Sequence, residues 1–139
     1  MSMRSRLFFV GPRDTVSSAG LLLLRVAFGG LMIVNHGWGK LMSFSAKKGG
    51  FPDPLGVGNE LSMALAIVGE VFAPALIVAG LATRLSAIPA AFTMAVAAFV
   101  VHGSDPLAKK EMALVYFAAF LAIALLGPGR WSLDRKLGG

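Results

Sequence analysis

The chain of 139 residues contains no cysteine, only two histidines and only seven acidic residues. The absence of cysteine excludes disulfides, thiolate metal sites and Cys-x-x-Cys redox chemistry. Charged residues make up 14% of the chain and hydrophobic residues 56%, which is more apolar surface than one small soluble core can bury. The apolar residues also occur in long blocks, as a bilayer requires. Composition therefore predicts one integral membrane domain.

Four of these apolar blocks predict membrane spans, at about 18–41, 61–81, 85–101 and 112–126. Each must be helical, because lipid cannot satisfy an open backbone. Short connections between the spans predict an all-α integral membrane protein, a four-transmembrane-helix up-down bundle. Trp38 and Trp131 are expected to be interfacial anchors, and Pro74 is expected to kink the second span.

The segments around this bundle follow from charge and turn residues. Residues 1–17 are expected to be a cytoplasmic N-terminal segment, because the apolar run 7–10 is too short for a signal peptide. Residues 18–129 then form the single transmembrane domain, with an outer loop at 42–60, and residues 130–139 form a cytoplasmic tail. The tails and the second connection carry seven Lys and Arg residues and the other two connections carry five, which favours both termini in the cytoplasm.

The net charge of +6 indicates a lipid partner more than nucleic acid. The basic residues flank apolar blocks and form no soluble patch, so anionic headgroups are the better partner. Within the outer loop, residues 51–58 hold two prolines and two glycines, which forbid a regular helix there. The stretch is apolar, so we expect it to cap the bundle, either as an ordinary ordered loop or as a lid over a pocket.

Two opposite charges lie inside the predicted spans. A charge in the hydrocarbon core costs roughly 2.5–3.5 kcal/mol on insertion scales, so it needs a partner or a function. Arg25 shares a helical face with His36 and Lys40, and Glu70 lies near the middle of the second span. Counting about 1.5 Å per residue places Arg25 and Glu70 roughly 8 Å apart in depth. Two interpretations stay open together: an ion pair that joins two helices, and a Glu70 that titrates or contacts a ligand.

The two histidines are expected near the outer surface, at the ends of the first and third spans. His36 and His102 fit four interpretations. They are interfacial side chains bonded to Asn35 or a carbonyl, donors to a quinone carbonyl, metal ligands together with Asp105 or Asp53, or a bis-histidine haem pair. The predicted polar pocket is made up of Arg25, His36, Lys40, Glu70 and His102.

Several short motifs together resemble the DoxX family. They are Leu-Leu-Arg-Val-Ala-Phe-Gly-Gly at 23–30, His-Gly-Trp-Gly-Lys-Leu at 36–41, Gly-Glu at 69–70 and Gly-Leu-Ala-Thr-Arg-Leu at 80–85. The resemblance extends from about residue 21 to about residue 126. It implies a small four-helix protein of the bacterial inner membrane, and some members resemble a subunit of a thiosulfate:quinone oxidoreductase. It also implies that Arg25, His36, Lys40, Glu70, Arg84 and His102 are the recurrent polar positions.

Three functions remain open at this level. The first is a subunit of a membrane oxidoreductase complex that binds a quinone and acts with a redox partner protein, because no flavin, haem or thiol motif is present in the chain. The second is a small-solute or proton-coupled transporter, which would need a homodimer because four spans are few. The third is a non-enzymatic assembly factor that binds other membrane proteins. No resident metal or cofactor is expected in any of the three.

Overall fold

The computed structural model describes residues 2–3, 9–11 and 14–138, and these form helices and loops with no strand. The first long helix runs through Thr15–Met42. It begins at α2 (Thr15–Met32), passes through a π-helical turn η1 (Ile33–Gly37) and ends in α3 (Trp38–Met42). Asp14 caps its start by accepting a 2.8 Å hydrogen bond from the Ser17 backbone.

The second and third long helices have the same composite build. After α4 (Phe44–Lys47), a short 3₁₀ turn η2 (Lys48–Gly50) leads into an extended loop. The second long helix consists of α5 (Asn59–Ile67), the π-helical turn η3 (Val68–Phe72) and α6 (Ala73–Ala79). The third consists of α7 (Thr83–Val96) and the π-helical turn η4 (Ala97–Val101). Each of the three long helices therefore contains one π-helical turn, at which the α-helical hydrogen-bond register changes.

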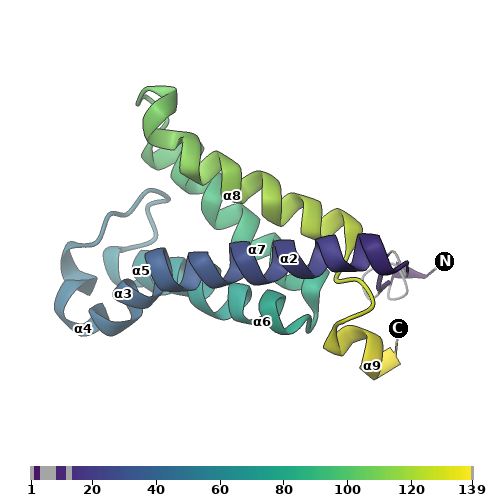
Figure 1. Ribbon diagram of the computed structural model, residues 1–139. Coiled ribbons are helices and arrows are strands. Elements are labelled where there is room, and N and C mark those ends of the chain that lie inside the picture. Colours follow the sequence, from purple (N-terminus) through teal and green to yellow (C-terminus); the bar gives the residue numbers. More distant parts are fainter. Residues whose placement is uncertain (1, 4–8, 12–13, 139) are drawn as a thin grey trace.

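The chain closes with α8 (Leu107–Leu126) and the short α9 (Leu133–Gly138). In Figure 1, α7 and α8 run side by side and lean away from α2 and α5 toward one end of the molecule, while α9 lies at the other end, near both termini. We call the first of these the loop end, because it holds residues 43–58 and the connection 102–106. We call the other the basic end. It holds the α6–α7 turn and residues 127–138, which include Arg130, Arg135 and Lys136.

Among the described residues, three helices are long and apolar enough to cross a bilayer: Thr15–Met42, Asn59–Ala79 and Thr83–Val101. They correspond to the first three predicted spans. The fourth, α8, has 20 residues but carries Lys109, Lys110 and Glu111 in its first turns, so it is not counted with them. The protein is therefore an all-α membrane protein whose apolar helices contact the lipid bilayer.

The core lies where α2, α6, α7 and α8 meet. Met32, Ile77, Phe120 and Ile123 are fully buried there, and small residues on α7 let the helices approach closely. These small residues are Ala87, Ala90 and Ala91. A second cluster at the loop end joins α3, α4 and α5 to the start of the extended loop; it consists of Met63, Ile67 and Val71 with Leu41, Phe44 and Phe51 packed against it.

Side chains close the helix ends at the basic end. Arg84 donates to the Ala124 carbonyl at 3.1 Å and the Leu125 carbonyl at 2.8 Å, and so caps the end of α8. Asp134 accepts from the backbone N–H groups of Ala82 at 2.6 Å and Thr83 at 2.9 Å, and so caps the start of α7.

Candidate functional site

The site is built around an ion pair inside the loop-end half of the molecule. Lys40 Nζ lies 2.6 Å from Glu70 Oε2, and it also donates to the His36 carbonyl at 3.2 Å. The side chain of Glu70 is only 9% exposed, whereas that of Lys40 is 29% exposed. The carboxylate is therefore buried, and the ammonium reaches it from the outer edge of the bundle.

Close contact between η1 and η3 sets this pairing. Gly37 is buried against the backbone of Glu70, and a Cβ at this position would collide with the Glu70 carbonyl. Pro74, the second residue of α6, lies one turn later and has no N–H to donate to that carbonyl. The π-helical turn η3 ends at Phe72, two residues before Pro74, and a kink of the second span at Pro74 stays a prediction.

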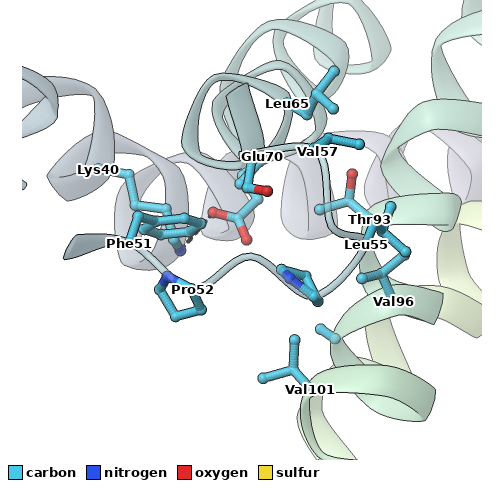
Figure 2. Close-up of a pocket in the computed structure, with 14 residues that line it drawn as sticks. Lys40, Phe51, Pro52, Leu55, Val57, Leu65, Glu70, Thr93, Val96 and Val101 are labelled. Atoms are coloured by element: carbon cyan, nitrogen blue, oxygen red, sulfur yellow. Dashed lines mark hydrogen bonds and ion pairs between the residues drawn. The ribbon is translucent and has the colours of Figure 1, made fainter. Parts of the chain in front are cut away.

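A cavity of about 310 Å³ lies beside the ion pair. Lys40 and Glu70 line it from the first two long helices, Thr93, Val96, Ala97 and Val101 line it from the third, and the extended loop covers it. Figure 2 shows Lys40 and Phe51 on one side of this space and Thr93 and Val96 on the other. The walls are otherwise mostly apolar, and this size and lining are typical of a small-molecule site.

The loop over the cavity is ordered by one carboxylate. Asp53 accepts hydrogen bonds from the Val57 and Gly58 backbone at 2.9 and 2.8 Å, and from the Ser62 hydroxyl at 2.7 Å. The Ser62 bond, followed by the Gly58 bond, holds the pKa of Asp53 below its usual range. The loop residues Phe51, Pro52, Pro54, Leu55 and Val57 line the cavity. Residues 51–58 thus cap the bundle, as the sequence predicts, and they cover a pocket.

Two hydroxyl groups of the cavity wall already donate hydrogen bonds within the protein, whereas Lys40 has one N–H left for a ligand. The Thr93 hydroxyl donates to the Pro89 carbonyl at 2.8 Å, and the Ser62 hydroxyl donates to Asp53. Both oxygens can therefore only accept from a ligand. Lys40 has two acceptors among the described residues, so one of its three N–H donors remains for a ligand.

Arg25 is not part of this site, and the predicted Arg25–Glu70 ion pair is wrong. Arg25 is fully buried at the basic end, where its guanidinium donates to four backbone carbonyls at 2.9–3.0 Å. These carbonyls belong to Ile77, Val78, Pro128 and Trp131. Two of these carbonyls lie at the end of α6 and two in the loop after α8, and a planar guanidinium with five N–H groups satisfies such carbonyls well.

The two histidines also lie apart from the cavity wall. The His36 ring packs edge-on against Tyr116, with ring centroids 5.5 Å apart. His102 Nδ1 lies 2.8 Å from Asp105 Oδ2 in the connection before α8. Within the described parts of the chain, no group of three His, Asp or Glu residues lies close enough to hold a metal ion. Each histidine therefore has a local partner of its own.

The remaining predicted positions do not line the cavity. Trp38 is about half exposed and Trp131 slightly less so, at opposite ends of the molecule. Sequence reasoning missed Ser62 and Thr93 as parts of the site, and it considered Asp53 only as a metal ligand and not as the residue that orders the loop. Asp53 had a usable signal, because an aspartate between two prolines is a strong turn former, but nothing local marks Ser62 or Thr93.

Fold and site together define a helical membrane protein with a charge-paired, mostly apolar cavity under a loop. A family model described as DoxX matches residues 20–103, more than half of the chain. The chain therefore belongs to the DoxX family. No curated protein and no solved structure matches it.

Proposed function

We propose that this protein binds a quinone head group in the cavity under residues 51–58, as a subunit of a membrane oxidoreductase complex. The observation that carries the proposal is the Lys40–Glu70 pair, 2.6 Å apart, on the wall of an otherwise mostly apolar cavity of about 310 Å³. Because the two charges compensate each other, the site favours an uncharged ligand. A quinone is uncharged, mostly apolar and carries oxygens at two ring positions.

Each wall of the cavity has a part in this binding. The remaining N–H of Lys40 donates to a carbonyl oxygen of the ring, and Glu70 is the group placed to exchange a proton with that oxygen. Apolar residues of the loop and of η4 contact the ring faces. The π-helical turns η3 and η4 line the cavity and η1 packs against η3, and such turns occur often at functional sites.

A quinone supplies only half of a redox reaction. The chain has no cysteine for a thiol or iron–sulfur centre and no flavin motif, so we assign the electron exchange to a separate partner protein. The quinone supplies the two-electron chemistry, and this chain positions it and handles its protons.

We place the protein in the bacterial inner membrane, with α8 as the fourth span and both termini in the cytoplasm. Lys109, Lys110 and Glu111 then lie at the loop end among headgroups, and Met112–Leu126 crosses the hydrocarbon core. Because the chain lacks cysteine, single cysteines at Ser104 and Lys136 report topology without background. Labelling of intact spheroplasts should modify the first and spare the second, and the reverse result would invert the topology.

The binding test uses purified protein titrated with short-chain ubiquinone and menaquinone. Lys40→Met and Glu70→Gln should each weaken binding by about tenfold or more, because each removes a charge-assisted contact. Lys48→Gln and Glu60→Gln are matched controls, since that exposed 3.3 Å ion pair also lies at the loop end but does not line the cavity. Equal affinity in all four variants, with the fold intact, would refute the proposal.

A further inference from the structure

Charge pairing differs sharply between the two ends of the molecule. The ion pairs found among the described residues are Lys40–Glu70, Lys48–Glu60 and His102–Asp105, and all of them lie at the loop end. The described part of the basic end has no ion pair. Its cations are therefore either bonded to neutral groups or left to solvent and lipid.

The acidic residues of the basic end are occupied as helix caps. Asp14 accepts from the Ser17 backbone at the start of α2, and this hydrogen bond holds the pKa of Asp14 below its usual range. Asp134 accepts from two backbone N–H groups at the start of α7. Helix N-termini carry partial positive charge, so both carboxylates are matched by the backbone, and neither forms an ion pair with a basic side chain of the described residues.

Arg25 and Arg84 are held by backbone carbonyls. The other described cations of this end, Arg130, Arg135 and Lys136, form no ion pair. Arg130 donates to the Thr15 hydroxyl at 3.1 Å, and its guanidinium lies 5.7 Å from the Trp131 ring centroid. Arg135 is half-buried, and its Nη1 atom is buried with no hydrogen-bond acceptor. A partly desolvated charge without a counter-charge is stabilised by any anion that reaches its exposed edge.

Apolar side chains beside these cations point to where that anion comes from. Trp131 is 44% exposed, and Leu133 and Leu137 of α9 are 40% and 75% exposed. Tryptophan and leucine next to arginine and lysine are typical of a segment that lies in the membrane interface. Figure 1 shows α9 at one end of the long helices, and helices that cross a bilayer end near its surface.

We propose that Arg130, Arg135 and Lys136, together with Trp131, form a binding site for the headgroup of an anionic phospholipid. The phosphodiester oxygens accept hydrogen bonds from the guanidinium groups, and the indole packs at the level of the glycerol backbone. Each basic residue close to an anionic membrane surface strengthens attraction by about fivefold. The proposal is independent of quinone binding, since none of these residues lines the cavity.

The chain provides its own reporters, because its two tryptophans lie at opposite ends. A Trp38→Phe protein reports only on Trp131, and a Trp131→Phe protein reports only on Trp38. Each is reconstituted into phosphatidylcholine vesicles, and quenching by brominated phosphatidylglycerol is compared with quenching by brominated phosphatidylcholine. Arg130 is left unchanged, because its contact with the indole would itself alter fluorescence.

We expect brominated phosphatidylglycerol to quench Trp131 preferentially and Trp38 with little preference. Arg135→Gln with Lys136→Gln should reduce the preference at Trp131 by up to about thirtyfold. Lys47→Gln with Lys109→Gln removes two exposed cations at the loop end and should leave that preference unchanged. Equal quenching of Trp131 by both lipids would overturn the proposal, as would the same preference at both tryptophans or a preference that survives Arg135→Gln with Lys136→Gln.

Discussion

Replacement of Arg25 tests the structural account most directly. Its side chain is 1% exposed and donates four hydrogen bonds to carbonyls of α6 and of the 128–131 segment. A hydrogen bond from a charged donor contributes about 1.5 kcal/mol at the low end of its range, so four contribute about 6 kcal/mol. Arg25→Met also removes the cost of burying the guanidinium, which is several kcal/mol. We therefore expect a net loss of about 3 kcal/mol in unfolding free energy.

The assay is reversible unfolding in mixed detergent and SDS, combined with limited trypsin digestion. Because Arg25 holds the Pro128 and Trp131 carbonyls, the variant should be cleaved faster at the C-terminal basic residues. Lys47→Gln serves as the control, since Lys47 is exposed and such a change should cost less than about 0.5 kcal/mol.

A double-mutant cycle separates this account from an ion pair within the membrane. Arg25 and Glu70 share no contact and have different partners, so the effects of Arg25→Met and Glu70→Gln should add within about 0.5 kcal/mol. A coupling energy of 1 kcal/mol or more would refute the reasoning, and so would an Arg25→Met protein of unchanged stability.

Two further predictions concern the loop end. Hydrogen bonds hold the pKa of Asp53 below its usual range, so its contribution to loop order is present at neutral pH and is lost as the pH falls below about 4. Hydrogen exchange of residues 51–58 should show this loss, whereas an Asp53→Asn protein should exchange rapidly at every pH; equal exchange in the two proteins at neutral pH would contradict the assignment. Gly37→Ala should lower the free energy of unfolding by about 1–3 kcal/mol, because the alanine Cβ would collide with the Glu70 carbonyl. Gly39→Ala enters open space and should be neutral or slightly stabilising, so equal effects in a thermal unfolding assay would argue against a tight contact between η1 and η3.

Short-range patterns were enough for much of the architecture. Long apolar blocks predicted three of the observed membrane helices to within about two residues at most of their ends, because hydrophobic length is a property of the local sequence. The Pro- and Gly-rich stretch 51–58 predicted a non-helical cap for the same reason. The fourth predicted span, 112–126, lies within α8, whose first turns carry Lys109, Lys110 and Glu111, so α8 is not among the three helices apolar enough to cross a bilayer.

Membrane character, helix positions and the presence of costly charges inside the bundle were determined by the sequence alone, because each depends on residues close together in the chain. Only the tertiary structure decided which cation pairs with Glu70. Periodicity gives the face and depth of a residue on its own helix, but the relative sliding of two helices depends on how their surfaces interlock. Here the contact of Gly37 with the Glu70 backbone places Lys40 beside the carboxylate. That same packing leaves Arg25 beside the carbonyls at the far end of α6.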